Sequence, residues 1–74
     1  MITSTLLMSQ TLATAVYDDA QEKLQLNFRD GSRYVYSKVP PDLFRGLLAA
    51  DSKGHFFNQH IRGALPYSKA APEL

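Results

Sequence analysis

Residues 23–36 have the sequence KLQLNFRDGSRYVY and carry the clearest structural signal in the chain. Polar and apolar residues alternate strictly over the first half of this stretch. This alternation predicts a half-buried strand with Leu24, Leu26 and Phe28 on its core-facing side. The Asp30–Gly31 pair that follows is a strong hairpin signal, so the remaining residues are expected to form an antiparallel partner strand.

The length of the hairpin loop decides which side of the partner strand is buried. A two-residue loop places Leu26 opposite Val35 and turns Tyr34 and Tyr36 away from the core. A three-residue loop with Gly31 in a left-handed conformation shifts the register by one residue, and both tyrosines then join the core. We favour the longer loop because it adds two large rings to the apolar face.

Sequence on either side of the hairpin completes the expected fold. Residues 12–17 are rich in β-branched, aromatic and small residues and predict another strand. The Val39-Pro40-Pro41 run ends the sheet, and apolar spacing predicts helices over about 41–50 and 53–62. The predicted fold is therefore α+β: a three-stranded antiparallel β-meander followed by two short helices packed on one face (β-β-β-α-α).

Composition limits the classes of protein to consider. The chain has 74 residues, enough for one domain, which we expect to span residues 10–67 between a flexible N-terminal segment (1–9) and a flexible C-terminal tail (68–74). Its 8 Lys+Arg and 7 Asp+Glu give a net charge of +1, with a mildly basic second half. There are no cysteines, no apparent signal peptide and no stretch of membrane-spanning length, so we expect a cytoplasmic protein that does not contact membranes.

Several motifs at characteristic spacings resemble those of the KTSC domain family. They are Tyr34-x-Tyr36, Val39-Pro40 and Ser52-Lys53-Gly54, and the resemblance covers about residues 10–67. That family consists of small stand-alone bacterial proteins and of C-terminal appendages of some lysyl-tRNA synthetases. The resemblance implies a small binding module, and the synthetase context suggests RNA as its ligand.

The start of the second predicted helix is a candidate phosphate-binding site. Ser52, Lys53, Gly54 and His55 combine free backbone N–H groups, the positive end of the helix dipole, a close-approach glycine and a cation. The alternative interpretation is a helix that Ser52 caps and whose lysine is simply solvated.

Five further residues are candidate RNA contacts: Arg29, Tyr34, Tyr36, Lys38 and Arg62. The two tyrosines suit base stacking if they are exposed, or they fill the core with their hydroxyls at a polar edge. Because neighbouring residues of a strand alternate in direction, Arg33, which directly precedes Tyr34, faces the side opposite the tyrosines.

Catalytic and metal sites are not expected. His55 and His60 do not share a helix face closely enough to bind one ion, and no nucleophile, base and orienting group stand at a recognisable spacing. We therefore expect a non-catalytic module without a cofactor that binds RNA, with tRNA as the first candidate. The alternative is a protein–protein interaction module, a homodimer or an adaptor, that uses the exposed sheet face or an edge strand.

Overall fold

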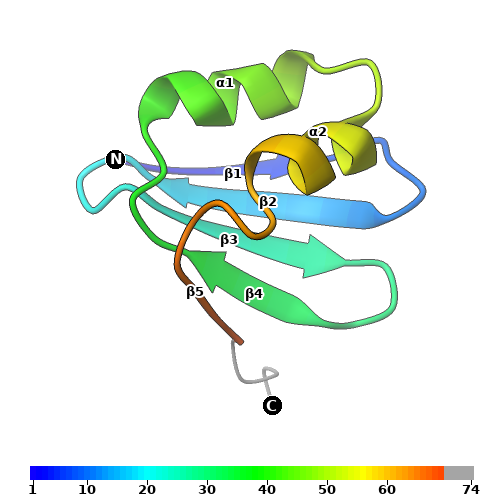
Figure 1. Cartoon of the computed structure of the whole chain (residues 1–74), viewed down its shortest axis with the longest axis horizontal. Coiled ribbons are helices and arrows are strands. Elements are labelled where there is room, and N and C mark those ends of the chain that lie inside the picture. The colour runs from blue at the N-terminus through cyan, green and yellow to red at the C-terminus, as the bar shows by residue number, and fades with distance from the viewer. Residues whose placement is uncertain (70–74) are drawn as a thin grey trace.

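The computed structural model describes residues 1–69, which form one antiparallel sheet covered on one face by two helices (Figure 1). The strands lie in the sheet in chain order, β1-β2-β3-β4-β5. The elements are β1 (Ile2–Leu6), β2 (Leu12–Asp18), β3 (Lys23–Phe28), β4 (Arg33–Tyr36), α1 (Pro41–Ala49), α2 (Lys53–His60) and β5 (Tyr67–Lys69). No helix within these residues is long and apolar enough to span a membrane.

The α+β class and the two helices agree with the sequence, but the predicted number of strands is wrong. The sheet has five strands where three were expected. The two additional strands form its edges: β1 lies in the segment 1–9, and β5 pairs with β4 at residues 67–69. Both are largely exposed, so neither shows the apolar alternation by which a strand is identified in sequence. Residues 70–74 of the expected tail lie outside the described residues.

The central hairpin has the register of the three-residue loop. Leu24 pairs with Tyr36 and Leu26 with Tyr34. The Phe28 N–H donates to the Ser32 carbonyl at 2.8 Å, which closes the loop. Gly31 has a φ of +95°, a conformation that glycine adopts without the steric cost of a Cβ atom. This register turns both tyrosines toward the helices.

A β-bulge in β2 lets two residues that are three positions apart face the core, whereas a regular strand would turn them to opposite sides. Leu12 pairs with Phe28, and Thr14 pairs with Asn27, the residue next to Phe28. The residue between Leu12 and Thr14, Ala13, is therefore the extra residue of the bulge. As a result, Leu12 and Ala15 are both buried although they are three positions apart. The bulge thus keeps core-facing side chains at both ends of β2.

The helices close the core with aromatic and aliphatic side chains. Phe44 of α1 stacks on Tyr17 of β2 with ring centroids 4.5 Å apart, and Phe57 of α2 is buried against β3 and β4. Gly46 of α1 meets the ring of Phe56, where an added Cβ would lie 2.9 Å from the ring. The glycine that weakens the α1 helix thus lets α2 pack closely against it.

Candidate functional site

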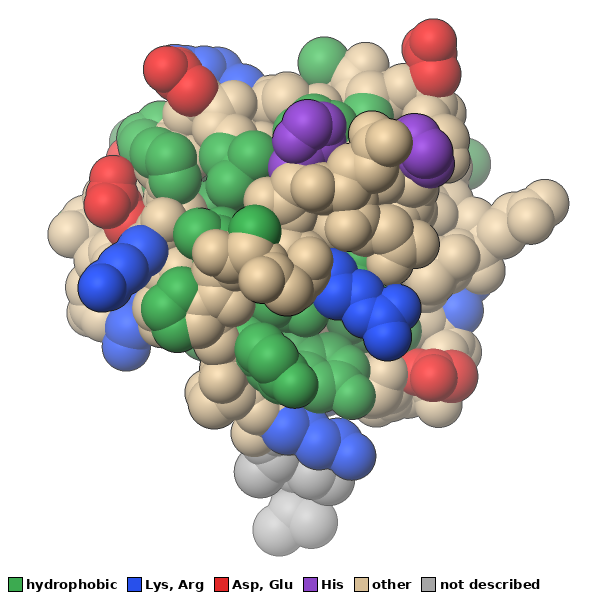
Figure 2. Space-filling view, in the orientation of Figure 1, with side chains coloured by type: hydrophobic (Ala, Val, Ile, Leu, Met, Phe, Trp, Pro, Cys, Tyr) green, Lys and Arg blue, Asp and Glu red, His purple; other side chains and the backbone are tan. Residues whose placement is uncertain are grey.

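A groove lined by aromatic rings opens where the hairpin, the end of α2 and β5 meet. Six of its lining residues define what we call the aromatic groove: Phe28, Tyr34, Tyr36, Phe57, Arg62 and Tyr67. Its volume is ≈ 400 Å³, within the range of small-ligand pockets. Figure 2 shows hydrophobic side chains gathered over β4 and β5, with basic side chains on two sides.

The rings of the groove differ in exposure and so differ in what they can contact. Tyr36 forms the floor, with 4% of its surface exposed, whereas Tyr67 on the rim is 59% exposed. The exposure of Tyr34 is intermediate between these two. Its ring meets that of Tyr67 edge-on at a centroid distance of 5.8 Å. The two tyrosines of the Tyr-x-Tyr motif therefore have different environments: Tyr36 belongs to the core and Tyr34 is accessible from the groove.

Charges at the rim of the groove are available to a ligand. Arg62 follows α2, and its guanidinium donates to the Asn58 amide oxygen at 3.4 Å. Lys69 is the cross-strand neighbour of Tyr34 and therefore lies on the same side of the sheet. Burial raises the pKa of the Tyr36 hydroxyl, with smaller contributions from Tyr67 and Tyr34 that Arg62 opposes. The Tyr36 hydroxyl is therefore neutral at physiological pH and can donate a hydrogen bond.

One acid also lines the groove. Asp30, in the hairpin loop, accepts hydrogen bonds from the Ser32 hydroxyl at 2.6 Å and from the Ser32 backbone N–H at 2.9 Å. These bonds lower the pKa of the Asp30 carboxyl, so it is ionised at neutral pH. The groove therefore offers stacking surfaces, cations and a carboxylate acceptor.

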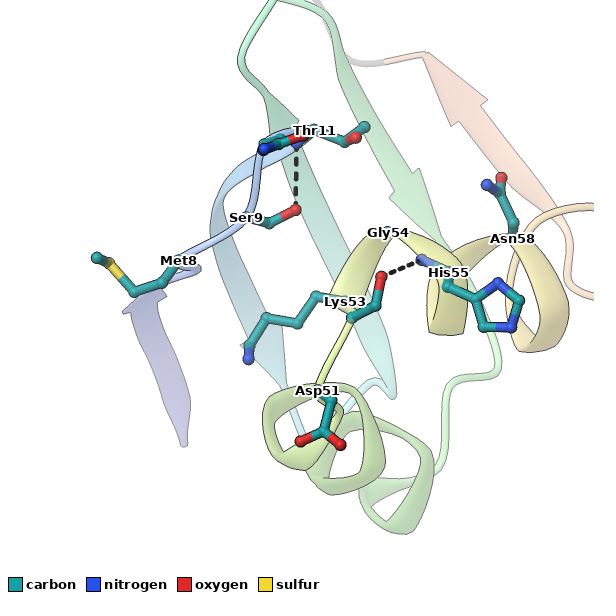
Figure 3. A pocket seen from close by; sticks show the side chains of 10 residues that line it. Met8, Ser9, Thr11, Asp51, Lys53, Gly54, His55 and Asn58 are labelled. Carbon is teal, nitrogen blue, oxygen red and sulfur yellow. Dashed lines mark hydrogen bonds between the residues drawn. The ribbon is translucent and has the colours of Figure 1, made fainter.

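The four predicted phosphate-site residues line a separate cleft at the start of α2. Ser52, Lys53, Gly54 and His55 lie there opposite residues 8–11, around a volume of ≈ 460 Å³ (Figure 3). The cleft is lined by the first turn of α2 and by Asn58, whereas the aromatic groove is lined by Phe57 and by Arg62 beyond the end of α2.

Three of these residues already form hydrogen bonds within the chain. The Ser52 hydroxyl accepts from the His55 backbone N–H at 3.3 Å, and the Lys53 ammonium donates to the Ala50 carbonyl at 3.2 Å. Asp51 also lines the cleft, and Figure 3 shows Lys53 and His55 directed to different sides. An anion in the cleft would compete with these bonds and meet a carboxylate, so the geometry favours the capped-helix interpretation.

The remaining predicted RNA contacts do not join either site. The Arg29 guanidinium donates to the Ser9 carbonyl at 2.5 Å and to the Leu7 carbonyl at 3.5 Å, so it holds the connection between β1 and β2. Lys38 is exposed beyond the end of β4, with a φ of +62°. Of the five candidates, the structure brings together Tyr34, Tyr36 and Arg62 and separates the other two from them.

Sequence reasoning missed Tyr67. It follows Pro66 in a region without an apolar pattern, and only its pairing with Tyr36 across β4 and β5 brings it to the groove. The only signal in the sequence was that Tyr67 is aromatic, like the two residues of the Tyr-x-Tyr motif. Within residues 1–69, no cluster of His, Asp or Glu side chains is suited to hold a metal ion.

The fold and the groove define a small α+β domain with a solvent-facing aromatic site. A sequence model of the KTSC domain matches residues 8–67, and the chain therefore belongs to the KTSC domain family. The crystal structure of a KTSC domain protein from Yersinia pestis has a TM-score of 0.90 at 27% identity; the alignment covers 96% of this chain and 100% of that one.

Relatives in sequence occur both as short proteins and as parts of long ones. A protein of Tsukamurella paurometabola is 46% identical over 54 residues, which cover 73% of this chain and 81% of the relative. The lysine–tRNA ligase of Nostoc punctiforme is 38% identical over 53 residues, which cover 72% of this chain but 9% of the ligase. The chain thus resembles one small part of that ligase.

Proposed function

We propose that this KTSC domain is a non-catalytic module that binds single-stranded RNA in the aromatic groove. The observation that carries the proposal is the set of accessible rings, Tyr34 and Tyr67, beside the cations Arg62 and Lys69. Aromatic rings accept the flat faces of unpaired bases, and arginine and lysine attract the phosphates that link them. The carboxylate of Asp30 can accept hydrogen bonds from base amino groups.

Two further observations support RNA as the ligand. The rings lie in a groove at the surface, where hydrophobic side chains are exposed next to basic ones (Figure 2). Residues similar to this chain occur within lysine–tRNA ligases, enzymes whose name states an RNA substrate. Transfer RNA is therefore the first structured RNA to test, and its unpaired regions are the parts that the groove fits.

The test is fluorescence anisotropy with a labelled mixed-sequence single-stranded RNA and with tRNA, each at low and at physiological salt. Binding should weaken as salt rises because phosphate contacts release counterions. Replacing the rim ring, Tyr67→Ala, should lower affinity about 5-fold or more, since one stacked base is worth roughly 1–3 kcal/mol. Tyr67→Phe keeps the ring and should bind like the wild type.

A second control separates the groove from general charge. Lys23 alternates with the core residue Leu24 and so lies on the opposite side of the sheet, and Lys23→Ala removes one cation there. It should leave affinity almost unchanged, whereas Arg62→Ala should reduce it. No binding of either RNA at low salt would contradict the proposal. Equal losses for Lys23→Ala and Arg62→Ala would show that attraction is not localised in the groove.

A further inference from the structure

The two edges of the sheet differ in how well they are protected from pairing. β5 has three residues, includes Lys69 and follows Pro66, features that discourage addition of another strand. β1 has five residues, Ile2–Leu6, without a charge or a proline, and it pairs with β2 in a continuous register. β1 therefore presents an edge to which another strand can add.

The pairing with β2 fixes which backbone groups of β1 are free. The Leu7 N–H donates to the Ala13 carbonyl, and the Asp19 N–H donates to the Met1 carbonyl. Because hydrogen-bonded residues alternate along an antiparallel pair, the odd-numbered residues of this segment direct their backbone groups to β2. The N–H and C=O groups of Ile2, Ser4 and Leu6 therefore point outward from the sheet.

The sequence pattern of β1 is the same from either end: apolar, threonine, serine, threonine, apolar. An antiparallel copy centred on Ser4 places Ile2 opposite Leu6 and Thr3 opposite Thr5. The three outward-facing residues then meet outward-facing residues, so every free N–H finds a carbonyl. This register gives about six hydrogen bonds, two for each such pair. Shifting it by two residues leaves some of these groups unpaired.

We infer that β1 pairs antiparallel with β1 of a second copy of this chain, about a two-fold axis at Ser4. Ile2 and Leu6 are 66% and 76% exposed, and the pairing joins each to its apolar counterpart on the sheet face away from the helices. A shallow apolar groove beside Leu6 and Val16 lies along the same line. The absence of charge on β1 means that two identical strands meet without repulsion.

The geometry has a consequence for the pair as a whole. The two sheets continue into one another, and the helices of both copies cover the same face. Because β5 is at the opposite edge from β1, the two aromatic grooves lie at the far ends of the joint sheet. The inference is therefore independent of RNA binding, and the two can fail separately.

Sedimentation equilibrium of the full chain across a wide concentration range tests the pairing. The wild type should show a concentration-dependent dimer. Ser4→Pro removes an N–H that points away from β2, so it should spare the fold and weaken dimerisation at least 10-fold. Ser4→Ala keeps that N–H and should dimerise like the wild type.

Amide exchange of the wild type provides a readout that needs no variant. Protection of the Ser4 and Leu6 amides should increase with protein concentration, whereas the Thr3 and Thr5 amides, already bonded to β2, should not change. A monomer at all concentrations, a Ser4→Pro dimer of wild-type stability, or concentration-independent exchange at Ser4 would overturn the inference. The exposed β1 edge would then be available only for pairing with a strand of a different protein.

Discussion

At the scale of single residues, Tyr17 links three parts of the molecule: β2, the segment that follows β4, and α1. Its hydroxyl donates to the Val39 carbonyl at 2.6 Å, and its ring stacks on Phe44. It is 3% exposed, so the hydrogen bond is formed away from water. One side chain of β2 thus fixes both the chain that leaves the sheet after β4 and the first helix above it.

The protonation of Tyr17 makes stability depend on pH at the alkaline end. Burial raises the pKa of Tyr17 above its ordinary value of 10.0, with nearby acids adding to the effect. The unfolded chain therefore ionises first as pH rises. This contribution to stability is complete below pH 10 and is lost progressively above it, up to the folded-state pKa.

Tyr17→Phe isolates this contribution. At about pH 8 the variant should be less stable by about 1–2 kcal/mol, because the Val39 carbonyl loses its buried donor. Urea unfolding of both proteins at about pH 8 and about pH 11 measures the difference, which should shrink at the higher pH because the variant has no hydroxyl to ionise at this position. Tyr36, whose pKa is also raised, is common to both proteins and cancels. An unchanged difference would mean that Tyr17 does not titrate as described.

At the scale of elements, strands with one buried face were predictable and edge strands were not. The alternation around Leu24 and the Asp30–Gly31 pair led to the hairpin and to its register, because a buried face and a tight turn both leave patterns in the sequence. β1 and β5 have little buried surface, so their pairing depends on neighbours rather than on their own residues.

The same limit applies to the candidate site. Tyr34 and Tyr36 were identified from their spacing, and Arg62 from its position at the end of α2. Arg29 was assigned to the same surface only because it is a cation near the hairpin. Its actual partners are carbonyls in a connection whose path the sequence does not specify.

Arg29 should therefore affect the attachment of β1 and leave the groove unchanged. Arg29→Met removes both hydrogen bonds to the β1–β2 connection and should lower the free energy of unfolding by about 1–3 kcal/mol. Amide exchange in residues 5–9 should quicken, while RNA affinity stays near that of the wild type. Urea unfolding and hydrogen exchange measure these effects.

Arg45→Met is the matched control. Arg45 forms an exposed ion pair with Asp42, which is worth less than about 1 kcal/mol. If Arg29→Met were no more destabilising than Arg45→Met, the guanidinium would not be holding the connection. A loss of RNA affinity in Arg29→Met alone would restore this residue to the RNA-binding surface.

At the scale of the whole molecule, the order of strands separates two surfaces. The β1 edge and the aromatic groove beside β5 are at opposite ends of the sheet. Ser4→Pro should therefore bind a short RNA that fits one groove as tightly as the wild type does. A longer RNA that reaches both grooves of a dimer should bind the wild type more tightly than the variant, because the second contact becomes intramolecular.

Anisotropy titrations with a short and a long single-stranded RNA of the same repeated sequence measure this difference. Ser4→Ala, which keeps the dimer, should show the wild-type preference for the longer RNA. If Ser4→Pro weakened binding of the short RNA, the edge and the groove would be coupled through the sheet. If both proteins preferred the longer RNA equally, the two copies would not act together.

The placement of the tyrosines gives the protein an intrinsic optical probe. The chain has four tyrosines and no tryptophan, and Tyr34, Tyr36 and Tyr67 all line the groove. Tyr17 is the exception and is shielded beneath α1. Ultraviolet emission from the unlabelled wild type therefore comes mainly from the groove, and a base stacked on these rings would quench it. Occupancy can be followed in the natural chain without attaching a dye.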